Sequence, residues 1–297
     1  MFLSIIIVSY NTKDLVKNCL QTVFGSNINF PFEVIVVDNN SGDGTVEMIN
    51  EEFKEVKLIV NSKNLGYGRA NNQGMKLAKG KYILLLNSDT EIINDVITKM
   101  VEWLEKRSEV GAVGCQLLYK NGKVQQSAGF IPKLSKIFYW ATFLDDLPIL
   151  RDIIKPYHVS DINFYKKEHE VGWVTGAFFL LRKEIFEKLG GFDEKIFMYT
   201  EEIEWCMKIK KAGWKIFYTP KTSVYHLKSA SPRNLNENAI IFEYKGLIYL
   251  FSKYKPKWEM IFLPSILRLG AFLRRLRFSI IGDKQKAELY AKAFKLV

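Results

Sequence analysis

The sequence predicts an α/β fold in which a mostly parallel sheet is covered by helices on both faces. Short apolar runs rich in β-branched residues, typical of strands buried on both faces, alternate with segments whose apolar residues recur at helical spacing. Strands that alternate with helices in this way pair in parallel through crossover connections. The composition, 48% hydrophobic and 25% charged over 297 residues, excludes disordered, collagen-like and coiled-coil proteins.

The predicted elements follow one another regularly in the first part of the chain. Each strand is a short apolar run, and the strands are expected at 5–8, 33–37, 57–60, 82–86 and 112–117. Apolar stripes at helical spacing begin near residues 15, 46, 70 and 96 and predict the helices between these strands. Gly80 is expected to end the third helix as its C′ residue.

The remainder of the chain is less regular. Residues 120–171 are aromatic and mixed, and we expect them to form a substrate-facing insertion. A helix over 201–211 begins at Thr200 as its N-cap and stops near Gly213, and short strands are expected at 215–218 and 223–225. From about residue 231 the pattern is helical and basic, so we expect a domain over 1–230 and a basic helical C-terminal extension over 231–297.

The positive charge of the chain is concentrated in this extension. The formal charge is +11, and residues 253–297 hold eleven Lys and Arg against three Asp and Glu, a net charge of +8. One basic end indicates contact with an anionic surface and argues against a protein that coats nucleic acid. Residues 260–281 mix apolar residues with arginines, as helices on anionic membranes do; the arginines are Arg268, Arg274, Arg275 and Arg277. Because these arginines do not share one helix face, a helix packed on the domain or in a homo-oligomer interface remains the alternative.

No disulfide, zinc site or membrane span is expected. Cys19, Cys115 and Cys206 are isolated, which indicates a reducing compartment. The apolar stretch 260–273 is shorter than the roughly 20 residues of a spanning helix. The apolar start lacks the features of a signal peptide, and we expect it to be a buried strand. These observations favour a cytoplasmic protein held peripherally at the inner face of the membrane.

Polar clusters follow three of the predicted strands. They are Ser9-Tyr10-Asn11, the segment 38–44 and Asn87-Ser88-Asp89. Ligands of open α/β sheets bind beyond the carboxyl ends of the strands, so three clusters there indicate a site. The alternative for each cluster is a turn, because strand ends need turn residues. Gly66-Tyr67-Gly68 lacks the third glycine of a dinucleotide-binding motif and does not follow the first strand, so we expect a structural turn there.

Six segments in this order resemble the family 2 glycosyltransferases, whose fold is called GT-A. They are SIIIVSYN from Ser4, VIVVDNNSGDGT from Val34, NLGYGRANNQG from Asn64, LLLNSDT from Leu84, WVTGAFFLLRKEIFEKLGGFDE from Trp173 and YTEEIEWCMKIKKAGWKI from Tyr199. The NSDT form is most similar to the bacterial rhamnosyltransferase-like branch. The resemblance covers residues 4 to about 231. It implies inverting transfer from a UDP- or dTDP-sugar, such as dTDP-rhamnose, to a hydroxyl of a saccharide or lipid-linked saccharide in cell-surface polysaccharide synthesis.

The resemblance assigns the donor nucleotide-sugar to the three clusters. Asp38 is similar to the family aspartate that accepts a hydrogen bond from the imide N–H of uracil or thymine, and a carboxylate can only accept. The alternative for Asp38 is to cap a turn into the next helix. Arg69 is expected to neutralise the donor diphosphate, although exposed arginines are common. The other donor-binding residues implied are Ser9, Asn11, Asn40, Asn87, Ser88 and Asp89.

The same resemblance implies a divalent cation, Mn²⁺ or Mg²⁺. Asn87-Ser88-Asp89 stands at the position of the family's DxD motif, which holds the cation on the donor diphosphate. Because Asn87 replaces the first aspartate, Asp89 becomes the principal ligand. His226 is similar to the family histidine that completes the metal site. His158 and His169 are assigned no role.

Glu202 takes the place of the general base in the family's E-D-x-D motif. It would accept the proton of an acceptor hydroxyl as that oxygen displaces the nucleotide diphosphate with inversion. Glutamate is one methylene longer than the usual aspartate. Glu201 is expected to orient the acceptor, and the residues expected near the transferred sugar and acceptor are Trp173, Thr175 and Gly176. The alternative for the two glutamates is stabilisation of the helix dipole.

Two other classes of function remain open. A sugar-phosphate nucleotidyltransferase needs a glycine-rich basic loop after the first strand, which Ser9-Tyr10-Asn11-Thr12 does not supply. A non-catalytic saccharide- or nucleotide-binding relative of the fold stays possible because Asn87 and Glu202 depart from the family pattern.

Overall fold

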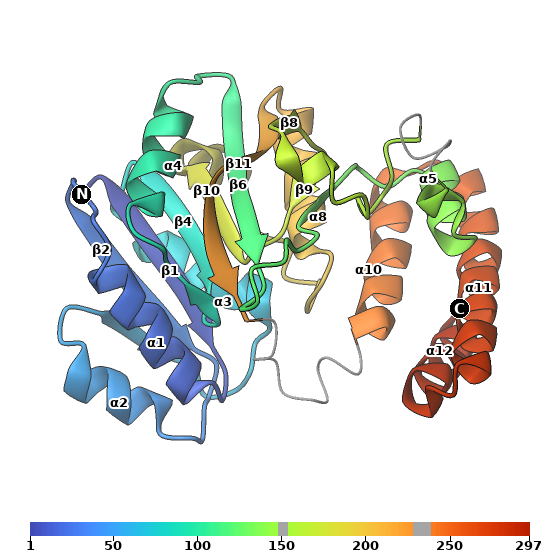
Figure 1. Ribbon diagram of the computed structural model, residues 1–297, viewed down its shortest axis with the longest axis horizontal. Coiled ribbons are helices and arrows are strands. Elements are labelled where there is room, and N and C mark those ends of the chain that lie inside the picture. Colours follow the sequence, from blue (N-terminus) through green and yellow to red (C-terminus); the bar gives the residue numbers. More distant parts are fainter. Residues whose placement is uncertain (148–153, 228–238) are drawn as a thin grey trace.

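The computed structural model describes residues 1–147, 154–227 and 239–297, and a mixed sheet flanked by helices forms the centre of this part of the chain (Figure 1). The strands are β1 (Leu3–Ser9), β2 (Phe32–Asp38), β3 (Lys57–Val60), β4 (Tyr82–Asn87), β5 (Thr90–Glu91), β6 (Val110–Leu118), β7 (Ala128–Gly129), β8 (His169–Glu170), β9 (Trp173–Val174), β10 (Phe178–Arg182) and β11 (Lys215–His226). The α-helices are α1 (Lys13–Phe24), α2 (Thr45–Glu52), α3 (Tyr67–Leu77), α4 (Val96–Glu105), α5 (Leu134–Ala141), α7 (Lys183–Leu189), α8 (Glu201–Lys211), α10 (Ala239–Tyr254), α11 (Lys257–Ile280) and α12 (Lys284–Leu296). The α/β class predicted from the sequence is confirmed.

The sheet is parallel on one side and mixed on the other. Its strand order is β3-β2-β1-β4-β10-β6-β11-β5, with β8 paired to β11. The strands β3, β2, β1 and β4 are mutually parallel, whereas β10 runs antiparallel between β4 and β6. β10 is absent from the strands predicted from the sequence, because its short apolar run leads directly into α7 and cannot be told from a buried helix segment by periodicity.

Helices cover both faces of the sheet, as predicted. Alternate residues of β1 point to opposite faces, so Ile5 and Ile7 pack with α1, α2 and α4, while Ile6 packs with α3 and α8. All three of these isoleucines are fully buried. The three cysteines are also buried and carry free thiols.

Two local predictions are corrected by the structure, and a third is confirmed. α3 ends at Leu77, so Gly80 is not its C′ residue; a Cβ at Gly80 would lie 2.5 Å from the Ser4 nitrogen, and glycine is needed there for close strand packing. Thr200 is the N-cap of α8, as predicted, and its buried hydroxyl makes no capping hydrogen bond. The two short strands expected at 215–218 and 223–225 form one strand, β11, with an irregularity between Thr219 and Ser223.

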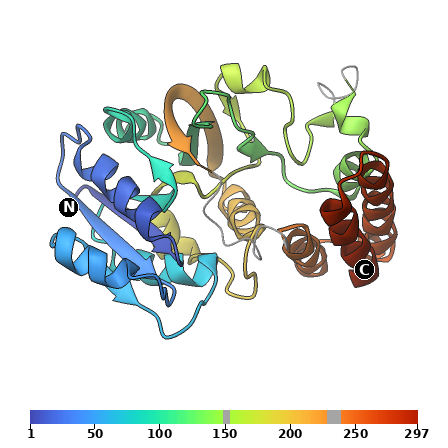
Figure 2. The ribbon, with the colours of Figure 1, turned by 60° about the horizontal axis from the view of Figure 1, so that its bottom comes forward.

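The C-terminal helices share a hydrophobic core with the sheet. Figure 2 shows α10 between α8 and the pair formed by α11 and α12. Leu247, Leu263 and Ala293 belong to the same buried cluster as residues of α8. Lys253 of α10 donates a hydrogen bond to the buried Glu204 of α8 at 2.9 Å. The predicted division after residue 230 falls outside the described residues.

Helix α11 has two apolar faces, which explains its irregular arginine spacing. Leu263, Leu267 and Ala271 are buried on one face together with Arg274, which is 7% exposed. The Arg274 guanidinium donates hydrogen bonds to the carbonyl oxygens of Trp140 (2.7 Å) and Ala141 (3.0 Å) at the C-terminal end of α5. The other face is exposed and carries Trp258, Phe262, Leu269, Phe272, Leu276 and Ile280. No helix among residues 1–147, 154–227 and 239–297 is long and apolar enough to cross a membrane.

We predict that Arg274→Ala destabilises the protein by about 2–4 kcal/mol, because two carbonyl groups of α5 lose charged donors at a buried site. The adjacent Arg275 is exposed, and Arg275→Ala provides the control, with an expected change within about 0.5 kcal/mol. Urea denaturation monitored by tryptophan fluorescence measures both. Equal stability of the two variants would contradict a structural role for the buried guanidinium.

Candidate active site

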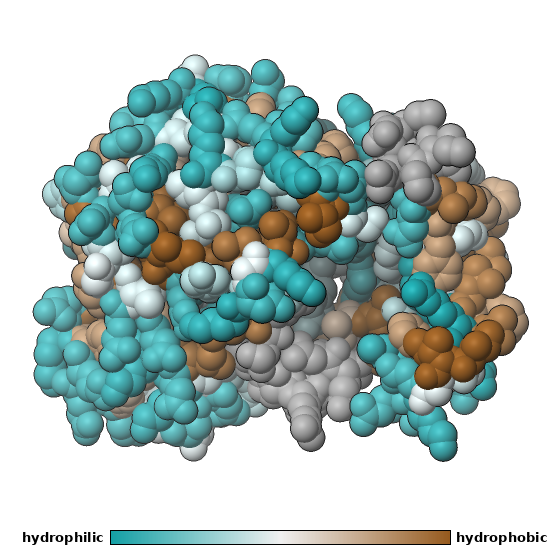
Figure 3. All heavy atoms as spheres, viewed as in Figure 1, coloured by the Kyte–Doolittle hydropathy of each residue, from teal (hydrophilic) through white to brown (hydrophobic). Residues whose placement is uncertain are grey.

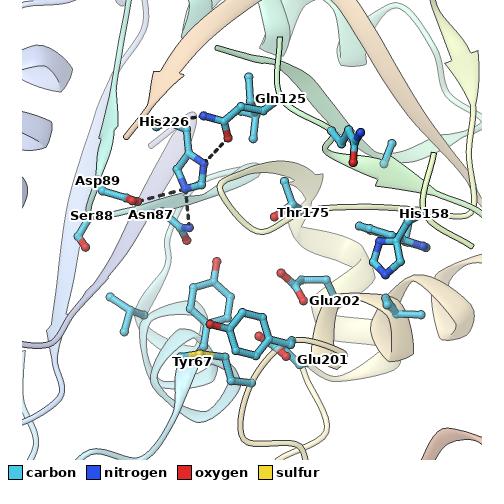
Figure 4. A pocket seen from close by; sticks show the side chains of 18 of the residues that line it. Tyr67, Asn87, Ser88, Asp89, Gln125, His158, Thr175, Glu201, Glu202 and His226 are labelled. Atoms are coloured by element: carbon cyan, nitrogen blue, oxygen red, sulfur yellow. Dashed lines mark hydrogen bonds and ion pairs between the residues drawn. The ribbon is translucent and has the colours of Figure 1, made fainter. Parts of the chain in front are cut away.

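A cavity of about 740 Å³ opens at the carboxyl ends of β1 and β4. Its lining comes from the ends of β1, β2 and β4, the start of α3, the insertion between β6 and β10, the start of α8 and the end of β11. Figure 4 shows Asn87, Asp89 and His226 on one side of this cavity, with Thr175 and Glu202 across from them and His158 beyond Glu202. The residues predicted from the sequence that line it are Ser9, Asn87, Ser88, Asp89, Trp173, Thr175, Glu201, Glu202 and His226.

Asp89 and His226 form a close pair on the first side. β5 pairs with the end of β11, with His226 opposite Thr90, and this register brings the imidazole to Asp89. The Asp89 Oδ1 atom lies 3.2 Å from His226 Nε2, and Asn87 Nδ2 lies 3.3 Å from the same nitrogen. Both Asp89 and Ser88 are buried.

Gln125 fixes the orientation of the His226 ring. Its amide nitrogen donates to the His226 carbonyl oxygen, which leaves its Oε1 atom to accept from Nδ1 of the ring at 2.9 Å. With the proton on Nδ1, the lone pair of Nε2 faces the Asp89 carboxylate. The Asn87 amide donates to this nitrogen, and the imidazole nitrogen and the carboxylate oxygen, 3.2 Å apart, are both ligand types that a divalent cation accepts.

This pair fits a metal ion that is held jointly with a ligand. In the described part of the chain, no group of three or more His, Cys, Asp or Glu side chains is arranged to hold a metal ion alone. One carboxylate and one oriented histidine leave coordination positions for substrate oxygens, the arrangement typical of Mg²⁺ and Mn²⁺ sites that bind phosphates.

Glu202 lies on the opposite side at the start of α8. Its Oε1 atom accepts a hydrogen bond of 3.0 Å from the Gly176 backbone N–H, and its carboxylate points into the cavity (Figure 4). Burial raises the pKa of Glu202 above its ordinary value, and the Gly176 hydrogen bond offsets part of the rise. The hydroxyl of Tyr67 donates to the Gly176 carbonyl oxygen at 2.9 Å, so Gly176 connects α3 with α8.

Glu201 is buried beside Glu202. Its Oε2 atom has no hydrogen-bond partner, and the side chain is only 2% exposed. Burial, together with the charge of Glu202, raises the pKa of Glu201 well above its ordinary value. When Glu201 and Glu202 together lose their first proton, the negative charge therefore lies on Glu202, and Glu201 beside it is neutral.

Four predicted donor-binding residues do not line the cavity. Arg69 is exposed, and its Nε atom donates to the Glu194 carbonyl oxygen at 3.0 Å. Asn40 is exposed, and Asn11 is bound to the Ser41–Gly42 turn. Arg69 and Asn11 thus make contacts within the protein, and the donor-binding roles of these three residues stay predictions.

Asp38 is fully buried, and its carboxylate is already occupied. It accepts hydrogen bonds from the Ser9 hydroxyl at 2.8 Å, the Ser41 backbone N–H at 2.8 Å and the Ser41 hydroxyl at 2.6 Å. This is the turn-stabilising arrangement given as the alternative from the sequence. Because Asp38 is fully buried, a contact between its carboxylate and a nucleobase requires residues that cover it to move.

The cavity residues that were not predicted from the sequence include Tyr67, Gln125, Trp140 and His158. His158 Nε2 lies 2.7 Å from Glu243 Oε1 of α10, and its ring packs edge-on against Tyr157 and Trp173. The Trp173 indole N–H donates to the Tyr157 carbonyl oxygen, which makes Trp173 largely a packing residue. Only Tyr67 has a signal in the sequence, since it lies in the GYGR segment.

The amino-acid sequence is similar to those of known proteins. The sequence model of the family described as "Glycosyl transferase family 2" matches residues 4–190. "O-antigen biosynthesis protein RfbC" of Myxococcus xanthus is 30% identical over 77% of this chain, which spans only 18% of that protein. "N-acetylglucosaminyl-diphospho-decaprenol L-rhamnosyltransferase" of Mycobacterium tuberculosis is 27% identical over 77% of this chain and 78% of its own length.

A solved structure shows the same fold. The mannosyltransferase PcManGT from Pyrobaculum calidifontis, in complex with GDP-Man and Mn²⁺, superposes with a TM-score of 0.57 at 19% identity. The match covers 99% of this chain and 79% of that chain. The GT-A fold expected from the sequence is therefore confirmed.

Proposed function

The chain belongs to glycosyl transferase family 2, and we propose that it is an inverting, metal-dependent enzyme that uses a UDP- or dTDP-sugar donor. The observation that carries this proposal is one cavity with the Asp89–His226 pair on one side and Glu202 on the other. The proposed acceptor is a hydroxyl of a saccharide or lipid-linked saccharide used in cell-surface polysaccharide synthesis. Similarity to the rhamnosyltransferase of M. tuberculosis supports dTDP-rhamnose as a donor candidate.

The donor diphosphate is proposed to lie against Asn87, Ser88 and Asp89. These residues follow β4, and Ser9 at the end of β1 lies in the same cavity wall. Asp89 and His226 would hold Mn²⁺ or Mg²⁺, which supplies positive charge that stabilises the leaving diphosphate. Asn87 is uncharged, so Asp89 is the principal anionic ligand among these three residues.

Glu202 is proposed to be the general base. It accepts the proton of the acceptor hydroxyl while that oxygen bonds to the anomeric carbon and the bond to the nucleotide diphosphate breaks. Gly176 holds one carboxylate oxygen of Glu202, and this hydrogen bond orients the carboxylate toward the cavity. Thr175 and the neutral Glu201 are proposed to position the acceptor. Displacement from the side opposite the leaving group inverts the anomeric centre.

The exposed face of α11 is proposed to lie on an anionic membrane. Figure 3 shows apolar side chains gathered over the C-terminal helices. Ile261 and Ile280 are 72% and 75% exposed, and Arg268 and Arg275 are exposed on the same helix. Apolar insertion combined with positive charge is the basis of interfacial binding by such helices. This position would bring the enzyme to a lipid-linked acceptor.

We expect UDP or dTDP to bind more tightly with Mn²⁺ than without it in calorimetric titrations, with GDP as the comparison. Asp89→Ala should abolish the gain from the metal ion, because it removes the proposed anionic ligand. The control is Asp95→Ala, a partly exposed aspartate that pairs with Lys99. Lack of binding by all three nucleotides in the presence of metal would overturn the proposed donor site.

Glu202→Gln should lower kcat by a factor on the order of 10²–10⁴ while nucleotide binding is retained. In the wild type, the raised pKa of Glu202 means that the base is protonated at low pH, so kcat should rise with pH through a value above the ordinary range for glutamate. Glu187→Gln, at an exposed position of α7, is the control. Unchanged kcat in Glu202→Gln would assign the base elsewhere.

Ile280→Asp should reduce co-sedimentation with phosphatidylglycerol vesicles at low salt about tenfold, since it places a charge on the apolar face of α11. Gln285→Asp makes the same charge change at an exposed position of α12 and should have a much smaller effect. Similar sedimentation of the two variants would argue against α11 as the membrane-binding face. Thermal unfolding of each variant checks that the fold is intact.

A further inference from the structure

Four lysines gather near the N-terminal ends of α5 and α11. They are Lys133, Lys136, Lys155 and Lys255. The ammonium groups of Lys136 and Lys155 lie 5.1 and 5.8 Å from the centre of the Phe130 ring. Burial and the charges of the other three lysines lower the pKa of Lys136 to about 8. This cluster concentrates positive charge that a bound anion would stabilise.

Little negative charge balances the cluster within the described chain. No carboxylate of the described residues forms an ion pair with any of the four lysines. Burial lowers the pKa of Lys255, and the charge of the nearby Glu259 offsets part of this effect. Among the described residues, the four lysines and Glu259 carry a formal net charge of +3.

An apolar groove of about 700 Å³ begins beside the lysine cluster and runs between α5 and α11. Lys133, Trp258 and Glu259 lie at its lysine end. Its apolar lining consists of Leu134, Phe138, Trp258, Phe262, Ile266 and Leu269. Phe138, Trp258 and Phe262 are each more than a third exposed, so the apolar surface of the groove is open to solvent.

Helix α5 connects the lysine cluster to the catalytic cavity. Lys136 and Trp140 are four residues apart and therefore share one face of α5, about 6 Å apart along the helix axis. Trp140 lines the catalytic cavity, whereas Phe138, on another face of α5, lines the groove. The lysine cluster at the N-terminal end of α5 thus lies between the catalytic cavity on one face of this helix and the groove on another face.

We propose that the lysine cluster binds the phosphate groups of a lipid-linked acceptor and that the groove holds the first part of its hydrocarbon chain. This inference rests on the proposed function, because it presumes a lipid-linked saccharide as acceptor. The order of the three features matches the order of the parts in such a molecule: sugar, phosphate and lipid. A second copy of the chain is disfavoured as the occupant, since the C-terminal end carries a net charge of +8 and would repel itself.

Calorimetric titration with geranylgeranyl diphosphate below its micelle concentration tests this site directly. Lys133→Ala/Lys136→Ala should weaken binding at least tenfold, whereas Lys284→Ala/Lys292→Ala, with the same charge change at exposed positions of α12, should stay within about twofold. Geranylgeraniol, which has the chain without the phosphates, should bind the wild type and both variants equally. Phe262→Asp should also weaken binding of geranylgeranyl diphosphate, because it places a charge in the apolar groove that would hold the hydrocarbon chain.

Equal affinity of geranylgeranyl diphosphate for the wild type and for Lys133→Ala/Lys136→Ala would overturn the proposal. It would also be overturned if that variant lost only its adsorption to phosphatidylglycerol vesicles, because the lysines would then contact bilayer headgroups. Titration of UDP and dTDP with Mn²⁺ on the same samples tests the donor site separately. Retained nucleotide binding without lipid binding would refute the acceptor site and leave the proposed glycosyltransferase activity intact.

Discussion

The antiparallel pairing of β10 with β4 is the constraint on which the site depends. Phe178 pairs with Leu86, and the Asn87 N–H donates to the Ala177 carbonyl oxygen at 3.2 Å, so the loop before β10 lies against the end of β4. In that loop, Gly176 bonds to Tyr67 on one side and to Glu202 on the other. A Cβ at Gly176 would lie 2.4 Å from the Tyr67 hydroxyl oxygen, and only glycine allows this approach. One strand pairing therefore fixes the distance between the two sides of the cavity.

The two sides of the cavity differ in their electrostatics. Around Glu202 and Glu201, burial favours the protonated acids, and a single backbone N–H is the main compensation at Glu202. Around Asp89, by contrast, an oriented imidazole nitrogen lies beside a carboxylate. The proposed cation site and the proposed base therefore lie on opposite sides of one cavity. This separation suits a reaction that stabilises negative charge at one end of the substrate and removes a proton at the other.

Strands and helices whose apolar residues recur with a clear period could be predicted from the sequence. The candidate site residues at the ends of those strands could be predicted with them. Ser9 and Asp89 were found because each follows a buried apolar strand, whose end lies at the ligand-binding edge of a parallel sheet. β10 was missed because five apolar residues before a helix have no distinctive period. Gln125 and His158 lie in the irregular insertion, and Gln125 is 101 residues from its partner His226, so no local pattern marks either residue. Arg69 and Asp38 are residue types that often bind ligands. The contact of Arg69 with Glu194 and those of Asp38 with Ser9 and Ser41 could not be predicted, because they depend on the tertiary structure.

The buried Glu204 of α8 also bears on how such proteins diversify. Glu204 lies two positions after the proposed base and is held by Lys253 and Tyr254 of α10, while Arg274 of α11 holds the end of α5. A chimera that received foreign C-terminal helices without the matching α5 and α8 would leave a buried carboxylate and two buried carbonyl groups without donors. Recombination that exchanges the C-terminal helices must therefore transfer the stretches that encode α5 and α8 together with them.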